Sequence, residues 1–258
     1  MFRAVAALWT REVVKFVRDR SRLAGALAQP LGFWVLLGLG FGGTFRMPGA
    51  EASVPYLEYL YPGIVALILL FTAIFSTISV VEERQQGFLQ AALVAPVPRA
   101  AIVLGNVLGG TTLALAQAAL FLLLAPLVGL APSLAGLGIV AAAAVPTALA
   151  FTALGFVIAW RLETTRGFHA VMNLFLLPMW FLSGAFFPAE GAPAVLRALM
   201  YANPAFYGVS ALRQGLYWPA EAPGAGLPLG LALGVSALFA LLLLGLATLT
   251  VRRPLFGR

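Results

Sequence analysis

The 258-residue chain is 62% hydrophobic and 10% charged, with a mean hydropathy of +0.98 and a formal net charge of +7. This composition lies far from that of an ordinary soluble domain. The chain has no Cys, one Lys, one Asp and one His, which excludes disulfide and thiol chemistry, a GxxxxGK(S/T) phosphate loop and most metal clusters. Any energy source for work by this protein must therefore come from elsewhere.

Residues 2–22 have the pattern of a basic amphipathic helix. At the helical period the basic residues gather on one side: Arg11, Lys15, Arg18 and Arg22. Bulky apolar residues gather on the opposite side: Phe2, Val5, Trp9, Val13 and Phe16. Such a helix lies flat on a membrane surface, either as a juxtamembrane anchor or as a contact for a partner protein.

Uninterrupted apolar stretches of about 20 residues follow, the length that crosses roughly 30 Å of hydrocarbon. We expect an all-α integral membrane protein with one domain over 1–258, in which 1–22 precede a six-span bundle at 23–251 and 252–258 form a tail. The six spans are expected at 24–43, 62–81, 101–125, 135–160, 168–187 and 227–251.

Basic residues orient these spans. With both termini in the cytoplasm, thirteen basic residues lie on the inner side. Three lie on the outer side: Arg46, Arg197 and Arg213. The excess of positive charge inside predicts that both termini are cytoplasmic.

The stretch between the fifth and sixth spans, about 188–226, is too apolar for a free loop. It contains two helix-compatible pieces, 194–201 and 205–217, separated by Asn203 and Pro204. Neither piece is long enough to span, so both are expected to be interfacial or re-entrant helices.

The centres of the spans contain no ionisable residue. This argues against a proton- or sodium-coupled carrier, which commonly needs a carboxylate or His inside the membrane. His169 lies at the cytoplasmic edge of the fifth span, where a structural role is the commoner one. Three hydroxyl residues share one face of the second span beside Phe75, and they either line a route or form interhelical hydrogen bonds: Thr72, Ser76 and Ser79. Gly105 and Gly109 permit close packing of the third span.

The loop "SVVEERQQGFLQAALVAPVPRA" (79–100) places Glu82 and Glu83 at the end of the second span. After Gly87, residues 88–95 can form about two helical turns with apolar side chains along one side, before proline ends them. The loop is either a surface turn that links two spans or a short docking helix with acidic residues beside it.

Two stretches together resemble the type-2 permeases of ATP-binding-cassette exporters: "SVVEERQQGFLQAALVAPVPRAAIVLGNVLGG" and "FLSGAFFPAEGAPAVLRALMYANPAFYGVSALRQGLY". The resemblance covers essentially the whole chain. It departs in detail at Gly87, which that family usually follows with Thr or a similar residue, whereas Phe88 follows here.

The resemblance implies roles for particular residues. Those expected to couple to an ATPase are Glu82, Glu83, Arg84, Gly87, Phe88 and Leu89 of the loop and Arg11, Lys15 and Arg18 of the N-terminal helix. Those expected nearest the substrate are Thr72, Phe75, Ser76, Ser79, Asn173, Phe181 and Ser183. Those expected to cap the path on the outer side are Pro188, Asn203, Pro204 and Arg213.

The resemblance also implies partners. Two copies of an ATPase subunit would bind ATP and magnesium, leaving no catalytic residue, cofactor or metal on this chain. A second permease copy or homologue and membrane lipid would complete the assembly, with no nucleic acid, in the plasma (inner) membrane of a bacterium. The expected cargo is an amphipathic drug-like, lipid-like or glycan molecule. The alternatives are a gradient-driven secondary transporter, a non-transporting scaffold and an integral membrane lipid-modifying enzyme.

Overall fold

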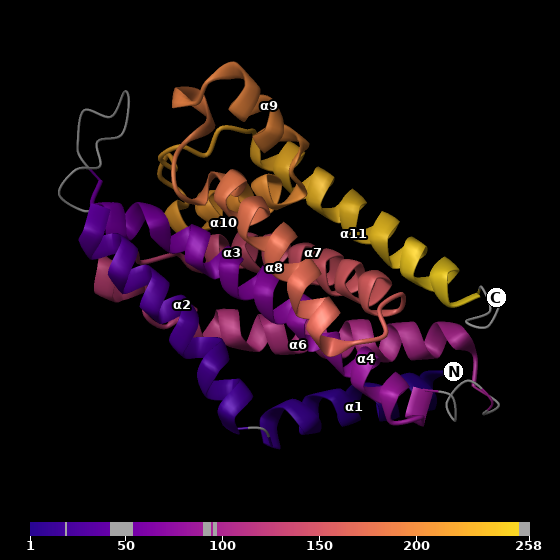
Figure 1. The fold of residues 1–258 in the computed structure, drawn as a ribbon. Coiled ribbons are helices and arrows are strands. Elements are labelled where there is room, and N and C mark those ends of the chain that lie inside the picture. Colours follow the sequence, from indigo (N-terminus) through magenta and orange to yellow (C-terminus); the bar gives the residue numbers. More distant parts are fainter. Residues whose placement is uncertain (19, 42–53, 90–93, 95–96, 253–258) are drawn as a thin grey trace.

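The computed structural model describes residues 1–18, 20–41, 54–89, 94 and 97–252. All regular structure within these residues is helical, which confirms the predicted all-α class. The α-helices form an elongated bundle (Figure 1). They are α1 (Phe2–Arg18), α2 (Arg20–Phe41), α3 (Tyr56–Ser76), α4 (Ile78–Gln85), α6 (Arg99–Leu122), α7 (Leu134–Ala159), α8 (Thr165–Trp180), α9 (Ala194–Ala202), α10 (Pro204–Tyr217) and α11 (Leu229–Arg252).

Several of these helices begin with a capping side chain or a proline. The Ser133 hydroxyl accepts a hydrogen bond from the Gly136 amide at 3.1 Å at the start of α7, and Thr164 does the same for Gly167 at the start of α8. Pro204 occupies the first position of α10. One π turn, Phe181–Ala185, follows α8 and contains Gly184 with φ of 79°.

Five helical stretches within the described residues are long and apolar enough to cross a membrane. They correspond to the second to sixth predicted spans: Tyr56–Gln85, Arg99–Leu122, Leu134–Ala159, Thr165–Ala185 and Leu229–Val251. The predicted first span falls on α2, of which Ala28–Phe41 is the apolar part among the described residues. The number of six spans therefore stays a prediction.

The helix of the second span is the centre of the bundle. In an apolar 18-residue stretch of Tyr56–Gln85, 89% is buried inside the protein. In the corresponding stretch of α11, only 22% is buried. Side chains along α3, among them Leu60, Ile64 and Ile68, have no exposed surface. A turn at Thr77 separates α3 from α4, so the C-terminal part of this span is a distinct eight-residue helix.

Helix α1 is seated on α6 through two glycines. A Cβ added to Gly105 would lie 2.5 Å from Leu8 Cβ, and one added to Gly109 would lie 2.8 Å from Glu12 Cβ. The indole N–H of Trp9 donates to the Thr112 hydroxyl at 3.0 Å. The predicted close packing at the two glycines is therefore confirmed, and the partner is the N-terminal helix.

Different helices lie at the two ends of the bundle. Figure 1 places α1 and α4 at one end, which we call the α1 end. The C-terminal turn of α11 lies there too, since the Arg99 guanidinium donates to the Val251 carbonyl at 3.3 Å. Figure 1 places α9 at the opposite end, which we call the α9 end.

Candidate functional site

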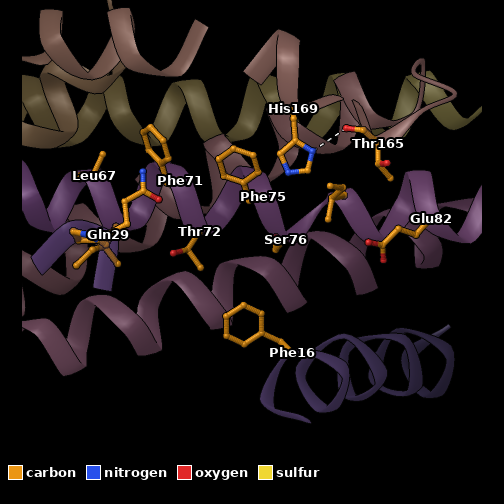
Figure 2. A pocket seen from close by; sticks show the side chains of 13 residues that line it. Phe16, Gln29, Leu67, Phe71, Thr72, Phe75, Ser76, Glu82, Thr165 and His169 are labelled. Carbon is orange, nitrogen blue, oxygen red and sulfur yellow. Dashed lines mark hydrogen bonds between the residues drawn. The ribbon is translucent and has the colours of Figure 1, made fainter. Parts of the chain in front are cut away.

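A cavity of about 400 Å³ opens beside the central helix, within the usual size range of ligand pockets. Four helical segments contribute to it: α1, α2, α3 with α4, and α8. Figure 2 shows the side chains that line it. They are Phe16, Gln29, Pro30, Leu67, Ile68, Phe71, Thr72, Phe75, Ser76, Ile78, Glu82, Thr165 and His169.

Aromatic rings form much of the cavity wall. The ring centroids of Phe71 and Phe75 are 5.9 Å apart, and those of Phe75 and His169 are 5.5 Å apart. In Figure 2 these three rings lie along one side, while Phe16 of α1 approaches from the other side. Phe71 and Phe75 are four residues apart on α3, so one helical face supplies both rings.

The hydroxyl protons of the lining residues on α3 are already used within the protein. Thr72 donates to the side-chain oxygen of Gln117 on α6, and Ser76 donates to the Ala73 carbonyl at 2.7 Å. On α8, His169 Nδ1 lies 2.9 Å from the Thr165 carbonyl, as the dashed line in Figure 2 marks. The α3 hydroxyls can therefore accept hydrogen bonds from a ligand more readily than they can donate.

An ion-pair junction adjoins the cavity at the α1 end. Lys15 Nζ lies 2.9 Å from Glu82 Oε2, and the Arg11 guanidinium contacts both Glu83 and Glu12. Glu82 is both a member of the junction and part of the cavity lining, so one carboxylate joins the two features.

The residues after Glu83 tie α4 to the end of α7. The Arg84 guanidinium donates to the carbonyls of Leu162, at 3.1 Å, and Trp160. The Gln85 amide donates to the Glu163 carbonyl at 2.9 Å. Since the last carbonyls of a helix lack partners inside the helix, Arg84 satisfies groups that would otherwise need water.

The predicted docking segment, 88–95, is described only in part, because 90–93 and 95 lie outside the described residues. Gly87 has a φ of 78°, which favours glycine. The Phe88 ring is 43% exposed and lies 4.2 Å below the Arg11 guanidinium, whereas Leu89 is buried. Arg18 is exposed at the end of α1.

The cavity contains three of the residues predicted to lie nearest the substrate: Thr72, Phe75 and Ser76. The other four do not line it. Ser79 and Ser183 are buried and donate to the carbonyls of Ser76 and Trp180. Asn173 is exposed on α8, and Phe181 stacks on Phe186 at 4.4 Å.

Arg213, predicted as part of an outer cap, is a buried hub at the α9 end. Its side chain is 1% exposed and donates to the carbonyls of Gly184 and Gly224, both at 2.9 Å, and to the Tyr59 hydroxyl at 3.1 Å. The guanidinium also lies 4.1 Å from the centre of the Tyr59 ring. No described carboxylate lies within ion-pair distance of it.

The remaining cap residues lie around the same point. The Asn203 side chain accepts from the Ala205 amide at 3.0 Å and donates to the Met179 carbonyl at 2.6 Å, which ties the start of α10 to the end of α8. Pro204 begins α10, and Pro188 lies against Gly224. A second cavity of about 450 Å³ lies beside Pro188 and Gly224.

Sequence reasoning missed several lining residues. The Phe71 and Phe75 spacing and the Thr165 and His169 spacing, each four residues, were available as signals of shared helical faces. Gln29 gave no such signal, because its place depends on how α2 crosses α3.

The fold and site are those of a helical bundle with several membrane-spanning lengths and a cavity that opens beside its central helix. The ABC-2 type transporter family has a sequence model that matches residues 3–217. The chain therefore belongs to the ABC-2 type transporter permease family, whose members normally work with an ATPase subunit.

Named relatives agree with this assignment. The chain is 31% identical over 238 residues to nodulation protein J of Sinorhizobium fredii, covering 90% of this chain and 86% of that protein. It is 26% identical over 239 residues to the daunorubicin resistance ABC transporter permease protein DrrB1 of Streptomyces coeruleorubidus, covering 90% and 81%. It is 24% identical over 218 residues to the inner membrane transport permease YadH of Escherichia coli, covering 82% of each chain.

Proposed function

We propose that this chain is the transmembrane subunit of an ATP-driven exporter, in which two permease copies and two ATPase subunits form the complete machine. The α1 end faces the cytoplasm and the ATPase, and the α9 end faces outward. The excess of basic residues expected on the α1 side supports this orientation. The chain itself performs no catalysis.

The observation that carries the proposal is the dual role of Glu82. It lines the cavity beside the central helix, and it also pairs with Lys15 of α1. Helix α1 and the segment after α4 are the two parts that the family resemblance assigns to ATPase contact. A rigid-body movement imposed on either part would therefore reach the cavity through a direct contact.

Glu82 and Glu83 form their ion pairs within this chain. Glu82 and Glu83 contact Lys15 and Arg11, so they hold α1 against the loop rather than standing ready for cations on the motor. The exposed Phe88 ring and the exposed Arg18 side chain remain as surfaces for the ATPase. ATP binding would favour one arrangement of the dimer only through a difference in affinity between states.

The test is purification of the tagged chain from native membranes in mild detergent, with mass spectrometry of the bound proteins. We expect an ATP-binding-cassette ATPase in equal amount to the permease. A variant in which a polar linker replaces 86–95 should lose the ATPase while it keeps the second permease copy. If the intact dimer carries no ATPase, the exporter assignment fails and a gradient-driven carrier takes its place.

A further inference from the structure

We propose that the cavity beside α3 selects an organic cation with apolar or aromatic surface, which Glu82 binds in exchange for Lys15. This inference rests on the proposed function, since it names the class of molecule that the exporter would carry. It depends on the charge of the cavity, on its aromatic wall and on the partly exposed ion pair between Lys15 and Glu82.

The charge of the cavity favours a cation. Among the described residues that line it, Glu82 is the one acidic side chain, and no Lys or Arg is among them. Figure 2 shows Glu82 at one end of the cavity, beyond Ser76. A carboxylate at the wall of a partly enclosed space attracts a cation and repels an anion more strongly than it would in bulk water.

The aromatic wall favours the same ligand. The faces of phenylalanine rings attract cations that are within about 6 Å. Phe71 and Phe75 lie along one side of the cavity, and Phe16 lies on the other side. An organic cation can place apolar groups against these rings and its charge toward Glu82.

The two hydroxyls of α3 fit a ligand that needs few hydrogen-bond donors. Thr72 and Ser76 already donate their hydroxyl protons to Gln117 and to the Ala73 carbonyl. A glycan would bring many hydroxyls that need both donors and acceptors on burial, and unpaired ones would be costly. The α3 side of the cavity therefore suits an amphipathic cation better than a sugar chain.

Lys15 can leave Glu82 without becoming buried and unpaired. Its side chain is 38% exposed and that of Glu82 is 25% exposed, so water reaches both partners. Ion pairs of this kind contribute little free energy and exchange readily. A cation that enters the cavity can replace the ammonium group on Glu82 while the Lys15 side chain turns toward water.

The exchange would link cavity occupancy to the position of α1. With Lys15 released, α1 keeps the Arg11 contact to Glu83 and its seat on α6 but loses one of its ties to α4. The segments assigned to ATPase contact would then sense the presence of a cation in the cavity.

The experiment measures binding of two ions of nearly equal size and shape, tetraphenylphosphonium and tetraphenylborate, to the purified permease in nanodiscs by equilibrium dialysis. Empty nanodiscs correct for partition into lipid. Three variants are compared with the unmodified chain: Glu82→Gln, Lys15→Met and, as a matched control, Glu163→Gln. Glu163 is an exposed carboxylate at the same end of the bundle and does not line the cavity.

We expect the unmodified chain to bind the phosphonium saturably and the borate only as lipid does. Loss of the Glu82 charge should weaken phosphonium binding about tenfold, and loss of its competitor Lys15 should tighten it about threefold. Glu163→Gln should bind as the unmodified chain does.

The opposite signs separate this inference from a purely structural role of the pair, because both substitutions break the same ion pair. Equal phosphonium binding by the unmodified chain and Glu82→Gln, or shifts of the same sign in both variants, would overturn it. The ATPase pull-down is independent of both probes. A bound ATPase without Glu82-dependent selectivity removes the inference alone, whereas selectivity without an ATPase removes the exporter assignment and leaves the cation site.

Discussion

Charged side chains hold both ends of this bundle, and they do so in different ways. At the α1 end, Lys15 and Arg11 meet carboxylates on α4, and the side chains stay partly exposed except for the buried Glu83 and Glu12. At the α9 end, Arg213 is fully buried and its recorded partners are carbonyl oxygens and the Tyr59 hydroxyl.

The difference follows from what each kind of partner can do. A carboxylate that shares a hydrated ion pair can exchange its cation at low cost. A buried guanidinium that satisfies several carbonyls cannot leave without stranding both itself and its acceptors. The Lys15 contact to Glu82 at the α1 end can therefore change, whereas the contacts of Arg213 at the α9 end are kept.

The largest expected effect comes from Arg213→Met. The carbonyls of Gly184 and Gly224 would lose their donor, and each buried polar group left unpaired costs about 1–3 kcal/mol. We expect a marked fall in the thermal unfolding temperature of the detergent-solubilised protein. Arg197→Met, which removes an exposed arginine of α9, is the control and should unfold as the unmodified chain does. Equal unfolding temperatures for both variants would show that the α9 end does not depend on this cation.

The next effect tests whether packing or charge positions α1. Gly105→Ala places a methyl group 2.5 Å from Leu8 Cβ, and overpacking of this kind costs about 1–3 kcal/mol. We expect faster hydrogen exchange along α1 and a lower unfolding temperature. In Gly138→Ala the added methyl meets nothing within 4 Å, so the same change of residue should not destabilise the protein. Unchanged exchange in Gly105→Ala would mean that the ion pairs alone hold the helix.

The smallest effect isolates the Lys15 and Glu82 pair by charge reversal. Lys15→Glu and Glu82→Lys should each destabilise α1, and the double variant should recover part of the loss. The coupling free energy should be about 0.5–1 kcal/mol, as for other exposed pairs, and should shrink at high salt. It is measured from the unfolding of the four proteins of the cycle. Lys15→Glu combined with Glu163→Lys serves as the unpaired control, and equal recovery there would argue against a specific contact.

Sequence reasoning reached the helices but not the pairings between them. The length of the apolar stretch predicted both ends of α7 to within one residue. Asn203 and Pro204 marked the start of α10. Glu82 and Glu83 stood out as charges at the end of a span, yet their cations lie 67 and 72 residues away in sequence. No local pattern specifies such a contact.

The same limit applies at the other end and in the cavity. Arg213 was marked as part of a cap, but backbone carbonyls carry no sequence signal, so its acceptors on Gly184 and Gly224 could not be read. The hydroxyl face of α3 was visible from Thr72 and Ser76, whereas Gln29 reaches the cavity through the crossing of helices. Periodicity identifies a face of one helix and leaves open which helix it meets.

The turn at Thr77 allows α4 to change its angle relative to α3 within the second span. Ser76 and Ile78, on either side of that turn, line the cavity, while Glu82 and Glu83 lie farther along the eight residues of α4. A helix of this length is about 12 Å long. A small change of angle at Thr77 would move the far end of α4 farther than it moves Ser76 and Ile78, and the ion pairs of Glu82 and Glu83 hold only over a few Å. A small movement of side chains around a bound molecule would thus produce a larger displacement where α4 contacts α1.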